Sequence, residues 1–357
     1  MTRPVGYYVH HQGAGHWERA CRIARALPRP CTLIGTLSGL DRTQAPGPVL
    51  DLPDDRLPAT GFAGRDGESG RPEAFHYAPL GLPGLRHRMA ALAVWIAEAD
   101  PALIVVDVSV EVALFARLMS VPVLMVRLAG TRTDPPHLEA FRSATRLIAP
   151  FPRVLEGETI PAWVREKTLY AGFLGAAASA ARDPDPAGPI VAVFGRGGAG
   201  GHREHLAAAA GAVPERDWHV LGPIHGETAR APPANLHLHG WVAEIEPFLA
   251  RSALVVGGAG DGVVAAVAAA GRRFVCLPEP RAFGEQTEKA AALERLGAAV
   301  VRTAWPAAED WPALIRAGFA LDPAAISTLH DPDAVPRLAA AIEAIARGIE
   351  ARAPSGL

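Results

Sequence analysis

The sequence has few cysteines, only two lysines and no hydrophobic run long enough to cross a membrane. Its three cysteines, Cys21, Cys31 and Cys276, form neither a CxxC pair nor a metal-ligand cluster. Such a sparse, odd set is typical of a reduced protein rather than a disulfide scaffold. The best internal apolar run, residues 102–116, contains two acids, whereas a membrane-spanning helix needs ~20 apolar residues. The short apolar start ends in histidines and is no signal peptide, so we expect a cytoplasmic protein without a transmembrane segment.

The chain also lacks a marked excess of either charge. Its 35 basic and 37 acidic residues leave a net charge of −2, which gives no sign of a nucleic-acid partner. Hydrophobic residues make up 49% of the 357 residues, enough for buried cores. At ~150 residues per domain, this length favours two domains.

Short apolar runs alternate with helical patterns, and this rhythm predicts an α/β fold with parallel sheets. Residues 5–9, 103–106 and 121–126 have the apolar character of buried strands. A stretch rich in Gly, Ala and Pro interrupts the rhythm, which restarts at Ile190. We predict two Rossmann-like domains facing a central cleft, with a last helix that crosses back to the first domain. The predicted parts are residues 1–170 (first domain), 171–189 (linker), 190–333 (second domain) and 334–357 (C-terminal helix and tail).

Three glycine-rich loops follow predicted strands. The first contains Gly13, Gly15 and His16. Glycines let the backbone approach a ligand, and the following helix offers free N–H groups. A dinucleotide site would need Gly or Ala in place of Glu18 and an acid after the second strand. Both are missing, which disfavours NAD or FAD and leaves either a binding loop or a simple tight turn.

The second loop spans Gly195 to Gly201 and has the form GxGxxG. The next predicted strand ends in Gly222 instead of a ribose-binding acid, and no Lys-Ser/Thr pair follows the glycines, so this is neither a dinucleotide fingerprint nor a P-loop. We predict a backbone-lined cradle for a diphosphate, to which Arg196 adds a charge-assisted contact. A purely structural loop is the alternative.

The third segment runs from Gly257 to Gly262 and is followed, one strand later, by Glu285 and Gln286 at the start of a helix. The acid there either compensates the helix dipole or, with its neighbour, binds hydroxyl groups of a polar ligand.

In their order and spacing, these features resemble the GT-B glycosyltransferases. The nearest resemblance is to the group (glycosyltransferase family 28-like) that contains the N-acetylglucosaminyltransferase of peptidoglycan-precursor synthesis. The matching segments are Gly13-Ala14-Gly15-His16, Gly195 to Gly201, Gly257 to Gly262, Ala269-Ala270-Gly271 and Glu285-Gln286.

The resemblance implies transfer of a sugar from a UDP- or dTDP-linked donor to the hydroxyl of a small or lipid-linked acceptor. It implies no metal and no cofactor beyond the donor. The implied donor-binding residues are Arg196, Gly197, Gly198, Gly200, Gly201, Gly240, Trp241, Val242, Gly258, Gly260, Asp261, Glu285 and Gln286. The expected acceptor-binding residues are Gly13, Gly15, His16 and His76.

One position departs from the family. Many relatives carry a ribose-binding Glu where this chain has Ala266. Either Asp261 holds the donor, or the donor carries a deoxyribose, or the chain has lost catalysis.

For catalysis, His16 is the predicted general base, because an imidazole titrates near neutral pH. Asp107 and Glu111 follow a strand and are further candidates, Asp107 either as the base or as the group that orients His16. The apolar loop at residues 78–85 could contact an acceptor or a membrane surface. Two other functions remain open: a nucleotide-sugar epimerase or hydrolase on the same fold, and a non-catalytic nucleotide-sugar-binding partner protein.

Overall fold

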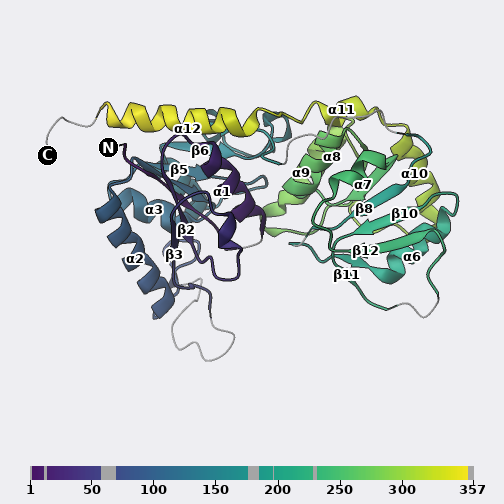
Figure 1. The fold of residues 1–357 in the computed structure, drawn as a ribbon, viewed down its shortest axis with the longest axis horizontal. Helices are drawn as coiled ribbons and strands as arrows, with labels where there is room; N and C mark the ends of the chain where they lie inside the picture. The colour runs from purple at the N-terminus through teal and green to yellow at the C-terminus, as the bar shows by residue number, and fades with distance from the viewer. Residues whose placement is uncertain are drawn as a thin grey trace.

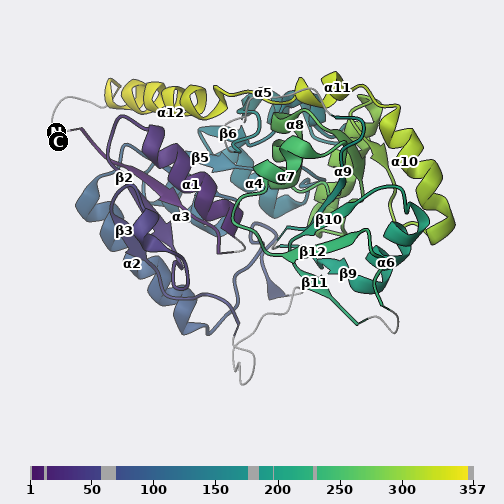
Figure 2. The same cartoon turned by 45° about the vertical axis from the view of Figure 1, so that its right-hand side comes forward.

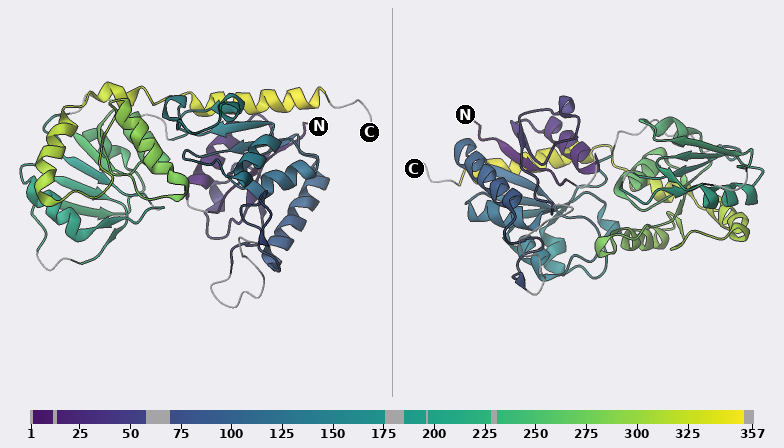
Figure 3. Two further views of the ribbon diagram at one scale, coloured as in Figure 1. Left: turned by 180° about the vertical axis from the view of Figure 1, so that it is seen from behind. Right: turned by 90° about the horizontal axis from the view of Figure 1, so that it is seen from below.

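The computed structural model describes residues 2–11, 14–57, 70–175, 185–195, 197–227 and 231–352. They form two α/β units that lie beside each other, with one long C-terminal helix running along the first unit (Figures 1 and 2). Views from behind and from below agree on this arrangement (Figure 3). Each unit is built on a parallel sheet.

The N-terminal sheet has seven strands in the order β3-β2-β1-β4-β5-β6-β7. Its central strands are wholly buried, which explains their continuous apolar sequences. The strands are β1 (Val5–Tyr8), β2 (Cys31–Gly35), β3 (Val49–Asp51), β4 (Leu103–Asp107), β5 (Val123–Val126), β6 (Arg146–Ala149) and β7 (Thr168–Tyr170). The helices are α1 (Ala14–Ala26), η1 (Arg42–Gln44), α2 (Pro83–Ala99), α3 (Val110–Leu118), α4 (Pro135–Ser143), η3 (Arg153–Leu155) and α5 (Ala162–Lys167).

The C-terminal sheet has six strands in the order β12-β10-β8-β13-β14-β15, and β9 pairs with β11 beside it. The strands are β8 (Ile190–Val193), β9 (Gly201–His202), β10 (Trp218–Leu221), β11 (Ile224–His225), β12 (Leu236–Gly240), β13 (Leu254–Gly257), β14 (Arg273–Cys276) and β15 (Val300–Val301). The helices are α6 (Arg203–Ala212), α7 (Glu246–Arg251), α8 (Asp261–Ala270), η4 (Ala282–Gly284), α9 (Glu285–Arg295), η5 (Ala308–Asp310), α10 (Trp311–Phe319), α11 (Pro323–Ser327) and α12 (Ala334–Glu350).

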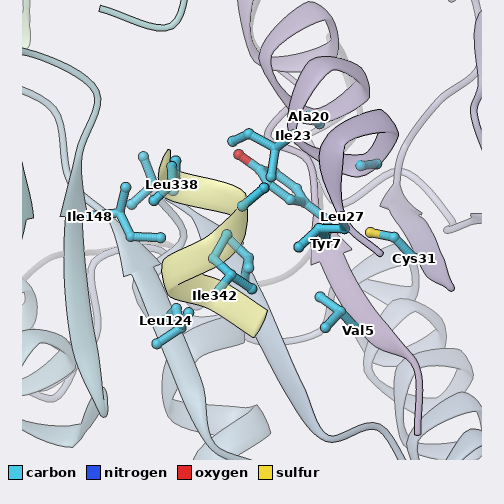
Figure 4. Close-up of a cluster of buried hydrophobic side chains, with 14 of the residues drawn as sticks. Val5, Tyr7, Ala20, Ile23, Leu27, Cys31, Leu124, Ile148, Leu338 and Ile342 are labelled. Atoms are coloured by element: carbon cyan, nitrogen blue, oxygen red, sulfur yellow. The ribbon is translucent and has the colours of Figure 1, made fainter. Parts of the chain in front are cut away.

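Helix α12 completes the core of the N-terminal unit. Its Leu338 and Ile342 are buried in one cluster with Val5 and Tyr7 of β1, and Figure 4 shows them lying against the sheet. Arg29, which is also buried, donates hydrogen bonds to the carboxylate of Glu343 on the same helix. The predicted return of the last helix to the first domain is confirmed.

The two units meet where the loop after β5 contacts the loop after β14. The carbonyl of Phe283 accepts a hydrogen bond from the amide of Thr131 at 2.8 Å. A Cβ on Gly130 would collide with the same carbonyl, so the contact requires glycine there. Since both loops follow carboxyl ends of parallel strands, these ends of the two sheets lie toward each other, which is where ligands bind in α/β folds.

The predicted fold class is confirmed, and the strands predicted at residues 5–9, 103–106 and 121–126 correspond to β1, β4 and β5, with ends that differ by at most two residues. Strands β3, β6, β7, β9, β11 and β15 are additional; they have two to four residues, too few for a clear pattern. The first sheet ends at Tyr170 and the second begins at Ile190, with residues 176–184 outside the described part. None of the helices described is both long and apolar enough for a membrane span.

Candidate active site between the two sheets

His16, Arg19 and Asp107 form a cluster at the carboxyl end of β4. His16 and Arg19 lie three residues apart on the first turns of α1, and such residues share one face of a helix. The His16 Nδ1 atom is 3.0 Å from Asp107 Oδ2. Arg19 Nη2 donates to both oxygens of Asp107 at 2.8 Å and also lies 2.8 Å from His16 Nδ1. The structure therefore brings together His16 and Asp107, two predicted catalytic residues, and adds Arg19, which was not predicted.

Charge compensation keeps Asp107 ionised although its side chain is fully buried. Burial alone would raise the pKa of this carboxyl, but the charges of Arg19 and His16 and their hydrogen bonds hold the pKa well below its usual range. His10 lies beside the cluster, with its ring 5.4 Å from that of His16. Burial, helped by the neighbouring His16 and His11, lowers the pKa of His10 to about 3, so His10 is neutral at physiological pH.

The C-terminal unit contributes Asp261 and Glu285, the first residues of α8 and α9. Asp261 pairs with the fully buried ammonium group of Lys289. Glu285 lies 3.8 Å from the guanidinium of Arg132, which belongs to the N-terminal unit. Burial and the negative charge of Asp261 raise the pKa of Glu285, and His16 is close enough to oppose that rise. Residues of both units thus face one another across the contact.

Gln286 has a more structural position than the sequence predicts. Its side chain is buried, and its Oε1 atom accepts hydrogen bonds from the amides of Ala259 (3.0 Å) and Glu279 (2.9 Å). The loops after β13 and β14 are thereby tied together, and Gly258 and Gly260 lie against the same amide group. The part of Gln286 that remains for a ligand is its Nε2 group.

The second glycine-rich loop is not the open cradle that its sequence predicts. The amide of Gly198 donates to the carbonyl of Gly195, and that of Gly201 donates to Pro223. Gly200 has a left-handed φ of +76°, and the loop continues as strand β9 before α6 begins. The carboxylate of Glu279 lies beside Gly198, in the space that a Cβ would take there, and accepts a hydrogen bond from Arg281. Within this loop, Gly197 faces open space.

For several predicted site residues the structure gives no contact that indicates a role in ligand binding. Gly13 and Arg196 lie outside the described residues. A side chain at Gly15 or at Gly240 would meet open space, and Trp241 is 52% exposed beside Gly240. Val242 and Ala266 pack against the core of the C-terminal unit. The departure at Ala266 therefore leaves a small apolar surface in place of the family's carboxylate.

Glu111 does not lie free in the site as a proton acceptor. Its Oε1 atom accepts hydrogen bonds from the amides of His76 (2.7 Å) and Tyr77 (2.6 Å). This corrects the expectation of a catalytic Glu111, because the carboxylate holds a loop. His76 lies on that loop against the rings of His137 and Phe283.

Sequence analysis missed Arg19, Arg132 and Lys289. The i, i+3 spacing of Arg19 from His16 was a usable signal. Lys289 had one as well: it is four residues after Glu285, on the same face of α9. The sequence around Arg132 contains no such signal, because only the packing of the two units brings Arg132 close to Glu285.

Comparisons with known proteins agree with this architecture. No family model matches the sequence, and neither does any curated protein. Solved structures match over nearly the whole chain. MurG of Acinetobacter baumannii has a TM-score of 0.68 and 16% identity, covering 96% of this chain and 99% of its own. CalG4, the calicheamicin glycosyltransferase, has a TM-score of 0.68 and 17% identity, covering 99% and 100%.

A third match is the spinosyn rhamnosyltransferase SpnG complexed with thymidine diphosphate. It has a TM-score of 0.63 and 16% identity and covers 96% of this chain and 100% of its own. Identities this low establish architecture, and all three neighbours have the same one. The chain therefore has the GT-B fold, the two-domain α/β fold of these glycosyltransferases.

Proposed function

We propose that this protein transfers a sugar from a nucleoside-diphosphate donor to a hydroxyl group of an acceptor. The observation that carries the proposal is the His16–Asp107 pair, which faces Asp261 and Glu285 of the other unit in a GT-B fold. A histidine oriented by a buried carboxylate is the arrangement that general-base catalysis needs.

His16 acts as the base in this proposal. The proposal requires the tautomer in which Nδ1 carries its proton toward Asp107 rather than accepting from Arg19 Nη2, which also lies beside it. The lone pair of Nε2 then takes the acceptor proton. The acceptor oxygen then attacks the anomeric carbon, and the bond from that carbon to the diphosphate oxygen breaks, so that the electron pair leaves with the nucleoside diphosphate. Arg19 keeps Asp107 ionised and lowers the cost of burying it.

The donor belongs on the C-terminal unit. In this proposal Glu285 and Asp261 accept hydrogen bonds from sugar hydroxyls, and the backbone of Gly197 contacts the diphosphate. The ion pairs of both carboxylates and the open space at Gly197 support these roles. Solved structures of SpnG hold thymidine diphosphate in one case and the spinosyn aglycone in another. By analogy we propose dTDP or UDP as the leaving group and a hydroxyl-bearing small molecule as the acceptor, with a lipid-linked acceptor as the alternative.

Calorimetry with dTDP and UDP tests the donor site. We expect one of them to bind, and Glu279→Gln to bind it more tightly, because this change removes a negative charge beside Gly198. His16→Ala should leave the affinity unchanged, since His16 belongs to the other unit, while kcat falls about 100- to 10,000-fold. Absence of binding to either nucleotide would refute the proposal.

Turnover separates the remaining alternatives. Release of nucleoside diphosphate that depends on a hydroxyl acceptor is the result expected of a transferase. Release without an acceptor identifies a hydrolase, and interconversion of the donor sugar identifies an epimerase. Tight binding without any turnover identifies the non-catalytic partner protein that Ala266 allows.

A further inference from the structure

His76, Asp134 and His137 converge at the edge of the site described above, next to Arg132. One potential ligand atom from each residue lies within 4.8 Å of the other two. His137 Nδ1 is 2.8 Å and 2.9 Å from the two oxygens of Asp134. No metal-ligand cluster is evident in the sequence, because His76 is 58 residues from Asp134 and only the fold brings them together.

The surroundings of each of the three residues limit where its side chain can lie. Asp134 precedes α4 but does not cap it, so its carboxylate is available to His137 one turn later. The His137 side chain is 2% exposed and packs edge-on against Phe283. The backbone at His76 is fixed by the two hydrogen bonds to Glu111. Such restricted side chains bind an ion with little loss of conformational freedom.

We propose that His76, Asp134 and His137 form a binding site for a divalent transition-metal ion of the zinc class. Two imidazoles and one carboxylate are ligands typical of Zn²⁺ in proteins, and three protein ligands leave a fourth position for water. Half-exposed Asp134 and exposed His76 give the ion a path from solvent, while buried His137 closes the inner side.

The positive charge of Arg132 lies beside this site and disfavours the binding of a cation. Its Nη1 atom lies 3.3 Å from His137 Nε2, whereas its other terminal nitrogen lies 3.8 Å from Glu285 of the C-terminal unit. An ion on Nδ1 of His137 requires the tautomer whose proton has moved from Nδ1 to Nε2. This Nε2–H then faces the Nη1 donor of Arg132, which favours a shift of Arg132 toward Glu285. Metal binding would therefore strengthen an ion pair between the two units, next to the Phe283 contact.

Metal titration of the full-length, metal-stripped protein tests the site without any measurement of sugar transfer. Zn²⁺ binding is followed by calorimetry, and Co²⁺ binding by its visible absorption, which is intense when coordination is tetrahedral. We expect one equivalent to bind. His76→Ala and Asp134→Asn, which change exposed and half-exposed side chains, should each weaken binding at least tenfold. His87→Ala, an exposed histidine on α2, is the matched control and should bind as the wild type does.

Three results would overturn the proposal. One is the absence of stoichiometric binding, and another is equal affinity in the wild type, His76→Ala and Asp134→Asn. The third is loss of the Co²⁺ spectrum in His219→Ala, because His219 lies in a separate histidine group with His237 and His239 on the C-terminal sheet. Circular dichroism of each variant verifies that it is folded.

Discussion

The N-terminal unit contains two histidine–aspartate pairs with opposite exposure. In the first, Asp107 is fully buried and the His16 side chain is 16% exposed. In the second, the His137 side chain is 2% exposed and Asp134 is 33% exposed. The same two residue types thus present an imidazole to the site in one case and a carboxylate to solvent in the other.

This inversion teaches that residue type alone does not define chemical role. A buried carboxylate paired with Arg19 stays charged and can orient the more exposed imidazole, which suits proton transfer. A buried imidazole beside a half-exposed carboxylate and a second histidine suits coordination of a cation. The predictions below test whether the two pairs differ in this way.

The largest difference is expected in turnover. Asp107→Asn should lower kcat about 1,000-fold, because an amide no longer favours the His16 tautomer that leaves Nε2 free. Asp134→Asn should change kcat less than about threefold, since this pair takes no part in proton transfer. Steady-state kinetics with saturating donor measures both. Similar losses in the two variants would show that the comparison is wrong.

A somewhat smaller difference is expected in stability. Asp107→Asn leaves the guanidinium of Arg19 buried without its countercharge, which should lower the free energy of unfolding by about 3 kcal/mol. Asp134→Asn removes a half-exposed partner and should cost about 1 kcal/mol or less. Urea unfolding of the metal-free protein provides the numbers, and equal midpoints for the two variants would contradict the assignment.

The smallest expected effect is on the pH dependence of stability. It concerns His10, which lies next to the His16–Asp107 pair. Burial lowers the pKa of His10, next to His16, to about 3, so the unfolded chain binds a proton near pH 6.5 that the folded chain binds only near pH 3. Stability is therefore full above pH 6.5 and falls as the pH drops toward 3. His10→Gln should remove this part of the pH dependence. Unfolding midpoints between pH 7 and 4 test it, with exposed His87→Gln as the control, and parallel curves for His10→Gln and wild type would count against it.

The fold was readable from the sequence because its signals are local. Continuous apolar strands, helices at 3.6-residue spacing and the break before Ile190 each lie within a short window. His16, Asp107 and Glu285 were found for the same reason: each stands at a strand end or a helix start, where the topology of parallel sheets gathers side chains.

What could not be predicted depends on contacts between distant segments. The position of Glu279 beside Gly198 follows from the packing of two loops some 80 residues apart. The role of Glu111 depends on where the loop of His76 lies. Asp134 and His137 are three residues apart, which is a local signal that they lie close together. His76, the third residue of the proposed metal site, had no such signal.

Helix α12 has a consequence for biosynthesis. Because the last helix fills the core of the first unit, that unit cannot attain its final hydrophobic packing while the ribosome is still translating the second one. Until α12 has been synthesised, the cluster that contains Val5 and Tyr7 lacks the apolar side chains of Leu338 and Ile342. Truncation of the chain before α12 would therefore damage the unit that is made first.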